Sequence, residues 1–220
     1  MDWSHGAFDG SPNCFLSAVS EQSRSRIAQA GKIVTVEANS YLSQEGSEGG
    51  FVLLPLQGQL RISKTTERGR HQVMCQVDPN ACGGICVLGL SDPAVGDIMA
   101  LTDTRLVVIA KKEFQCLVRV DPDLCERSWS AATECLSHFS TLVESLSFHK
   151  VSERVARTLL DSTSETGELL RLTQAEMAAI VGSTREVVAR CLAGMQNDGV
   201  IRLGRGRITV LDRGKLAARL

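Results

Sequence analysis

The pattern of apolar and polar positions changes character twice along the chain. Residues 15–30 have the spacing of a helix, and Gly31 is placed to end it. From Lys32 onward, short runs of apolar and β-branched residues follow one another, with turn-forming residues between them. These runs read IVTVEA, FVLLPLQGQLRIS, HQVMCQV, DIMALT and RLVVIAKKEF. The pattern predicts an antiparallel sandwich or barrel that follows a first helix.

After Asp121–Pro122 a helical pattern continues to about His149. Apolar or small residues recur there three and four positions apart, which is the spacing of a coiled-coil seam. Because a long helix on a small domain needs a partner for such a stripe, we predict a parallel homodimer. The predicted interface consists of Cys125, Ala132, Cys135, Phe139, Leu142 and Leu146. The alternative is a helix that packs only against its own β-domain.

Residues 172–211, LTQAEMAAIVGSTREVVARCLAGMQNDGVIRLGRGRITVL, predict a helix, a tight turn at Gly182, a second helix and a short β-hairpin. This order is typical of a winged helix-turn-helix, which inserts its second helix into the major groove of DNA. Each helix has a residue suited to cap it and a glutamate three positions later. These pairs are Thr173 with Glu176 and Ser183 with Glu186.

The predicted fold class is therefore α+β. It has a β-rich domain over residues 1–120, an antiparallel sandwich or barrel. A dimerisation helix over 121–149 and a winged helix-turn-helix domain over 150–220 follow. The charge distribution agrees, because 12 Lys/Arg against 8 Asp/Glu from Lys150 onward give +4, whereas 12 against 17 before it give −5. A basic carboxyl-terminal part beside an acidic amino-terminal part fits a DNA-binding module attached to a domain that does not touch DNA.

The chain shows no amino-terminal signal segment and no apolar stretch of the roughly 20 residues that would span a membrane. We therefore expect a cytoplasmic protein without a membrane partner. Eight cysteines in such a protein indicate thiols, metal ligands or redox chemistry rather than a disulfide framework.

Residues 172–201, the segment RGRITVLD and the upstream segment FHKVSERVARTLLD resemble the CRP/FNR superfamily of bacterial transcription factors. The resemblance implies that the β-rich domain of residues 1–120 is a sensor domain with an antiparallel double-stranded β-helix (jelly roll). The resemblance implies that Arg185, Glu186 and Arg190 read a GTGA-like half-site of two-fold double-stranded DNA. The chemistry agrees, since arginine can hold guanine through two hydrogen bonds and glutamate can accept from cytosine. RNA polymerase would be a further partner if the protein is an activator. The residues expected at phosphates are Thr173, Gln174, Ser183, Thr184 and Arg205.

Members of this superfamily that bind cyclic nucleotides carry a Gly-Glu pair for the ribose and an Arg-Ser pair for the phosphate. The corresponding stretch here reads NACGGICVLGLSDPAVGDIMA, with Ile85 in place of the glutamate and no Arg or Lys from Asn80 to Ala100. A cyclic phosphate would lack its charge-assisted contacts. We therefore expect no cyclic nucleotide.

The same stretch contains Cys82 and Cys86, and Cys75 lies on the strand that leads into it. Thiolates are soft ligands, so three of them suit a soft metal or a metalloid such as arsenite, and they also suit a thiol-reactive signal. We predict that this cysteine cluster controls the affinity for DNA. The alternative is that the three are ordinary buried cysteines, which pack as small hydrophobic residues.

Other sensing chemistries stay open. An iron–sulfur cluster would need Cys116 or Cys125 beside the three central cysteines, and haem would need a ligand such as His71 in an unfamiliar geometry. A constitutive regulator with a vestigial pocket is a further alternative. A cupin-like enzyme is disfavoured because the four histidines are scattered, so we expect no enzyme. The sequence does not decide whether Cys14, Cys116, Cys125, Cys135 or Cys191 take part in sensing.

Overall fold

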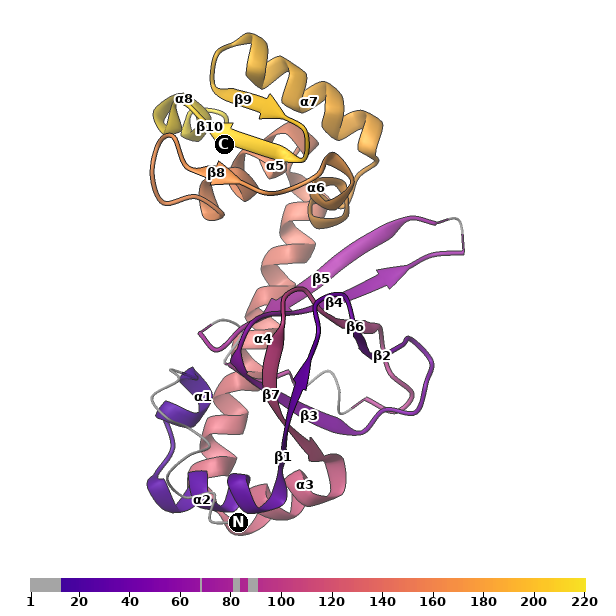
Figure 1. The fold of residues 1–220 in the computed structure, drawn as a ribbon, viewed down its shortest axis with the longest axis vertical. Helices are drawn as coiled ribbons and strands as arrows, with labels where there is room; N and C mark the ends of the chain where they lie inside the picture. Colours follow the sequence, from indigo (N-terminus) through magenta and orange to yellow (C-terminus); the bar gives the residue numbers. More distant parts are fainter. Residues whose placement is uncertain (1–12, 68, 81–83, 87–90) are drawn as a thin grey trace. The chain divides into compact units, whose positions relative to one another are not determined.

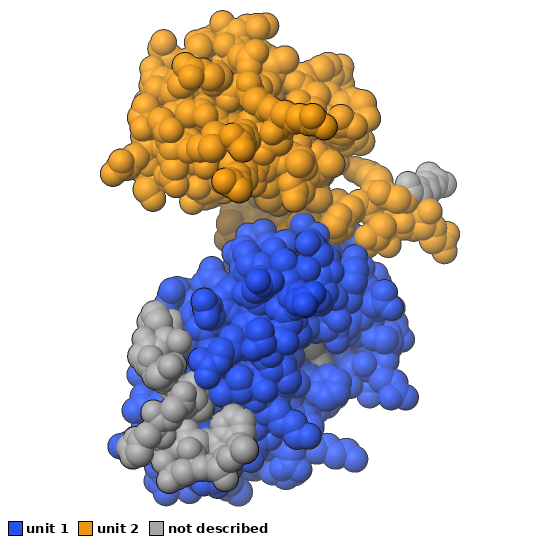
Figure 2. Space-filling view, viewed as in Figure 1, with its two compact units in different colours: residues 1–64, 74–140 blue, residues 65–73, 141–220 orange. Residues whose placement is uncertain are grey.

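The computed structural model describes residues 13–67, 69–80, 84–86 and 91–220. The chain forms two compact units, which Figure 2 shows in different colours. The first comprises residues 1–64 and 74–140, and the second comprises residues 65–73 and 141–220. The long helix contributes residues to both. Within the described ranges, no helix is both long enough and apolar enough to span a bilayer.

The first unit is built on two antiparallel sheets, as the sequence predicts (Figure 1). One sheet has the order β1-β7-β3 and the other has the order β2-β6-β4-β5. The strands are β1 (Lys32–Val36), β2 (Tyr41–Ser43), β3 (Phe51–Gln57), β4 (Leu60–Thr65), β5 (His71–Val77), β6 (Asp97–Ala100) and β7 (Thr104–Ala110). Apart from the consecutive strands β4 and β5, strands that are neighbours in a sheet are not consecutive in the chain, so this arrangement is a jelly roll rather than a simple meander.

Strand β3 explains why the sequence FVLLPL is apolar at successive positions. Its residues Val52 to Leu56 are all buried, because the strand has a hydrophobic core on each face. Leu53 belongs to the core between the two sheets. Its neighbours Val52 and Leu54 belong to a second core, between the sheet and the helices.

The amino-terminal helix is interrupted, contrary to the prediction of one helix over 15–30. The structure has α1 (Cys14–Ser17) and α2 (Glu21–Ala30), and the side chain of Ser20 caps α2 by accepting from the Ser23 amide. Serine is a strong helix N-cap, and this local preference ends the first helix and starts the next. The segment KKEF, read as the end of a strand, instead begins α3 (Lys111–Val120).

The long helix α4 (Pro122–Phe148) is anchored at its start by Asp121. The Asp121 carboxylate accepts from the amides of Asp123 and Leu124 at 3.2 and 3.3 Å. It also accepts from the Ser23 hydroxyl at 2.9 Å and the Arg26 guanidinium at 2.8 Å. Burial alone raises the pKa of Asp121, but the hydrogen bonds from Arg26 and Ser23 outweigh it and hold the pKa below its ordinary value.

The exposed apolar stripe of α4 differs from the predicted dimer seam by one residue at every second position, and the seam itself stays a prediction. Of the predicted positions, Cys125 and Leu146 are exposed, while Ala132, Cys135, Phe139 and Leu142 are half-buried. The large apolar side chains of α4 that the structure leaves exposed are Trp129 (77%), Leu136 (70%), Val143 (62%), Leu146 (37%) and, at the end of the helix, Phe148 (81%). All but Phe148 lie on one stripe with an alternating spacing of four and three: Cys125, Trp129, Ala132, Leu136, Phe139, Val143 and Leu146.

The physical reason for the shift is that the neighbouring face of α4 packs against its own β-domain. Leu124 and Ala131 are buried in the helix-covered core. His138 lies on the same face, and its Nε2 is 2.9 Å from the carbonyl oxygen of Met74. Cys135 and Leu142 lie close to this face in the helical repeat, so they belong to its edge rather than to the centre of the stripe.

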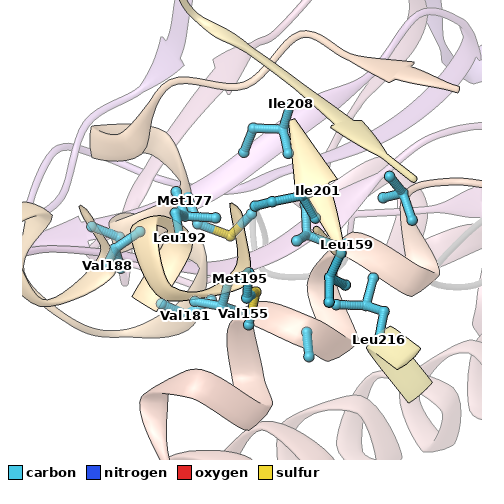
Figure 3. Packing of buried hydrophobic residues seen from close by; sticks show 14 residues of the cluster. Val155, Leu159, Met177, Val181, Val188, Leu192, Met195, Ile201, Ile208 and Leu216 are labelled. Carbon is cyan, nitrogen blue, oxygen red and sulfur yellow. The ribbon is translucent and has the colours of Figure 1, made fainter. Parts of the chain in front are cut away.

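The second unit contains the predicted winged helix-turn-helix (Figure 1). Its elements are α5 (Val151–Asp161), β8 (Leu169–Leu170), α6 (Gln174–Val181), α7 (Arg185–Asn197), β9 (Ile201–Gly204), β10 (Arg207–Val210) and α8 (Arg213–Ala217). One core joins them, and Figure 3 shows its side chains meeting from the helices and from the wing. It includes Val155, Leu159, Met177, Val181, Val188, Leu192, Met195, Ile201, Ile208 and Leu216.

Candidate functional site

The turn between α6 and α7 has the geometry that the sequence predicts for a helix-turn-helix. Gly182 ends α6 in the left-handed conformation, with φ of 64° and ψ of 48°. Ser183 then donates its amide to the Ala178 carbonyl at 3.0 Å, which closes the turn. A glycine is needed here because left-handed backbone costs other residues about 1–2 kcal/mol.

The cap of the recognition helix α7 differs from the prediction by one residue. Thr184, not Ser183, is the N-cap, and its hydroxyl accepts from the Val187 amide at 3.4 Å. The predicted capping box of Ser183 with Glu186 is therefore wrong. Thr184 takes the position because Ser183 is used to close the turn.

The three residues expected to read bases lie exposed on α7. Arg185, Glu186 and Arg190 all face solvent, whereas Val188 and Leu192 face the core. The Glu186 pKa is lowered by its own backbone amide at the helix start, by the Thr184 hydroxyl and by the charge of Arg185. Glu186 is thus held as an acceptor beside an arginine donor, which is the combination that a G·C-containing half-site requires.

A groove joins the start of α6, the start of α7 and the wing. It has a volume of about 470 Å³ and brings together four predicted contact residues, namely Thr173, Gln174, Arg185 and Arg205. The wing residue Arg207 also lines it, as its place beside Arg205 in the RGRITVL hairpin suggests for a phosphate contact. The alternation of inward and outward side chains in β10 places Arg207 outward beside the buried Ile208.

The amide and the hydroxyl of Thr173 already form hydrogen bonds within the protein. Its hydroxyl and its amide both donate to the Glu176 carboxylate, at 2.7 and 2.8 Å, and its hydroxyl accepts from the Glu176 amide. This confirms the predicted capping box of α6. A phosphate at this edge of the groove would therefore meet Gln174 and the arginines more readily than the Thr173 hydroxyl.

The second candidate site lies in the core between the two sheets. Cys75 on β5 and Cys86 are both buried there, with 3% and 2% of their surface exposed. The Cys86 amide donates to the Leu53 carbonyl at 2.7 Å, which holds this cysteine against β3. Cys82 lies outside the described residues, so the convergence of three sulfurs stays a prediction.

The other cysteines are distributed over different elements. Cys116 on α3 and Cys125 on α4 are exposed, and these helices pack on the helix-covered side of the sheet, away from Cys75 and Cys86. Cys191 is half-buried against the core of the second unit. The described residues hold no group of three or more His, Cys, Asp or Glu side chains that could bind a metal. Among the described cysteines, neither Cys116 nor Cys125 is therefore grouped with Cys75 and Cys86.

Cys14 lies closer to the loop of the central cysteines than its place in the sequence suggests. Its amide donates to the Pro79 carbonyl at 2.7 Å, and a side chain at Gly84 would come within 2.9 Å of its sulfur. The Arg127 guanidinium is 4.0 Å from the same sulfur. Burial raises the pKa of the Cys14 thiol and Arg127 only partly offsets this, so Cys14 is not activated as a thiolate.

Comparison with known proteins agrees with this architecture. Residues 33–121 match the family model of the cyclic nucleotide-binding domain, and residues 153–219 match that of the Crp-like helix-turn-helix domain. The cyclic AMP receptor protein of Thermus thermophilus is 26% identical over 173 residues, which are 78% of this chain and 80% of that protein.

Solved structures show the same fold. A transcriptional regulator of the CRP/FNR family from Eubacterium rectale superposes with a TM-score of 0.79 at 24% identity, over 92% of this chain and 95% of its own. A CRP/FNR-family regulator from Thermus thermophilus gives a TM-score of 0.73 at 25% identity, over 86% and 97% of the two chains.

A sensor-type jelly roll, a long helix and a winged helix-turn-helix together define the class of DNA-binding transcription regulators. The chain belongs to the CRP/FNR family of these regulators.

Proposed function

We propose that the chain acts as a homodimer that binds a two-fold GTGA-like site in double-stranded DNA. The supporting observation is the exposure of Arg185, Glu186 and Arg190 on one helix, beside a groove that Arg205 and Arg207 line. The base-reading residues specify the sequence, and the groove binds the phosphate backbone. Two copies bring two recognition helices to half-sites about one helical turn apart.

The second part of the proposal concerns the signal. DNA affinity is controlled by a soft metal or a metalloid such as arsenite, or by a thiol-reactive compound, at Cys75, Cys82 and Cys86. The support is that Cys75 and Cys86 share the interior of the β-sandwich and that the stretch from Asn80 to Ala100 contains no Arg or Lys for a cyclic phosphate. Cyclic nucleotides and enzymatic activity are not part of the proposed function. The protein acts in the cytoplasm, and as an activator it would contact RNA polymerase.

DNA binding is tested by fluorescence anisotropy with a duplex that carries two GTGA-type half-sites. The reduced protein is titrated alone, with arsenite, with Cu(I) and with a thiol oxidant. The proposal expects at least one of these to change the affinity tenfold or more, and expects the C82S and C86S variants to lose that response. Cys116→Ser is the matched control, because Cys116 is an exposed thiol on α3. An unchanged response in C82S and C86S would contradict the sensor site.

Two alternatives give different results in the same experiments. An iron–sulfur or haem sensor of the same family would be coloured when purified without oxygen. A constitutive regulator would be colourless, would bind the duplex and would respond to none of the three reagents. The apolar side chains that fill the sandwich interior favour this second alternative over the first.

A further inference from the structure

Arg154, in the first turns of α5, lies where two other helices end. α4 ends at Phe148 and α6 ends at Val181. The last four carbonyl groups of a helix have no partner within that helix and need donors from elsewhere. Arg154 supplies donors to both ends at once.

Its three guanidinium nitrogens divide between the two helix ends. Nε donates to the Val181 carbonyl at 2.7 Å and Nη2 is 3.5 Å from the Gly182 carbonyl, both at the end of α6. Nη1 is directed to the end of α4, with distances of 2.8, 3.3 and 3.4 Å to the carbonyls of His149, Ser145 and Leu146.

The chemistry of this position requires an arginine. A guanidinium has five N–H donors in a fixed planar fork, whereas a lysine ammonium is a single point of donation. The positive charge also lies at the negative ends of two helix dipoles. Burial lowers the pKa of Arg154, which reflects its removal from water.

The same turn is packed directly on the last turn of α4. A Cβ atom at Gly182 would lie 2.5 Å from the Leu146 Cδ2 atom, so the helix-turn-helix backbone touches the α4 side chain without room for another atom. Hydrogen bonds and packing therefore join the turn to α4 over the same few residues.

We propose that Arg154 is a positioning residue for DNA binding, which fixes the helix-turn-helix turn and the following helix α7 to the carboxyl-terminal end of α4. Arg154 acts through backbone carbonyls and not through DNA. The inference rests on the proposed function, in which a change in α4 alters DNA binding by α7. The Arg154 hydrogen bonds are the connection through which such a change would pass from α4 to α7.

The test compares Arg154→Lys and Arg154→Gln in the full chain with Arg157→Gln, an exposed arginine three residues along α5. Affinity for the GTGA-type duplex is measured at several salt concentrations, at a temperature well below the Tm of each variant. Both Arg154 variants should bind at least tenfold more weakly than the unmodified protein, with an unchanged dependence on salt. Arg157→Gln should stay within threefold.

Hydrogen exchange provides the readout that does not depend on DNA. Amides of residues 182–187 should exchange faster in Arg154→Lys than in the unmodified protein, because the turn is released from α4. The proposal is overturned if exchange is unchanged, or if the variants lose only thermal stability and keep their affinity. It is also overturned if the salt slope falls by about one, which would make Arg154 a phosphate contact. An unmodified protein that binds no GTGA-type duplex would refute the proposed function, while the exchange rates would still decide the link.

Discussion

Replacement of Leu136 by aspartate tests where the dimer seam runs. Leu136 is 70% exposed and lies at the middle of the apolar stripe on α4. Full burial of a leucine side chain contributes about 1.5–3 kcal/mol, so burial of the exposed part contributes roughly 1–2 kcal/mol per protomer and about 2–4 kcal/mol per dimer. Because about 1.4 kcal/mol is a factor of ten, the dimer Kd should rise by roughly 30-fold to 1000-fold. Facing aspartates at this position would add to the loss.

Sedimentation equilibrium or mass photometry across nanomolar to micromolar protein measures this Kd, and circular dichroism checks that each variant folds. Ser137→Asp is the matched control, because it introduces the same charge one residue later, about 100° around the helix and away from the stripe. The expected result is a monomeric Leu136→Asp and a dimeric Ser137→Asp. Equal dimerisation of the two variants would refute the stripe as the interface.

Four further substitutions have expected results. Arg185→Gln should weaken the binding free energy for the GTGA-type duplex by about 1–3 kcal/mol and relax the preference at one base pair. Arg205→Gln should weaken binding to every sequence alike and lower the slope of log affinity against log salt concentration by about one. A loss of base preference in Arg205→Gln would reverse these roles. Asp121→Asn should lower stability in urea at pH 7. Because the folded pKa of Asp121 lies below the unfolded value, the ionised carboxylate stabilises the fold above the unfolded pKa, and this contribution disappears as the pH falls through the folded pKa. The difference in stability between the variant and the unmodified protein should therefore shrink progressively as the solution is acidified; a constant difference would contradict this. Gly182→Ala should lower the free energy of unfolding by about 1–2 kcal/mol, because alanine is strained in the left-handed conformation, and by more because its Cβ would clash with Leu146. A thermal melt measures this loss, and an unchanged Tm would show that the turn relaxes.

The sequence was most informative where local rules and tertiary packing agree. Gly182 and the Thr173–Glu176 capping box lie as the sequence predicts. The predicted single helix over 15–30 was wrong because a serine cap at Ser20 outweighs helical periodicity. A cap contributes about 1 kcal/mol, which is enough to decide between one helix and two in a short segment.

The apolar stripe of α4 could not be located from the sequence for a different reason. Two adjacent apolar faces of α4 have nearly the same heptad spacing, and only packing against the β-domain separates them. Cys135 and Leu142 therefore fit the pattern as well as Leu136 and Val143 do. Arg154 was not predicted for a related reason. Its partners are carbonyl groups at the ends of two other helices, and no spacing in the sequence records them.

Strand β3 has a consequence for how a signal could leave the sandwich. Its carbonyl groups support both sides of the domain, because Leu53 accepts from the Cys86 amide at 2.7 Å and Pro55 accepts from the Asn13 side chain, also at 2.7 Å. The single strand β3 therefore separates the core between the two sheets, which contains Cys75 and Cys86, from the core between the sheet and the helices. Cys86 and the α1 N-cap Asn13 are thus bonded to carbonyls two residues apart on one strand, so a change at Cys86 has a direct hydrogen-bonded route to the amino-terminal helices.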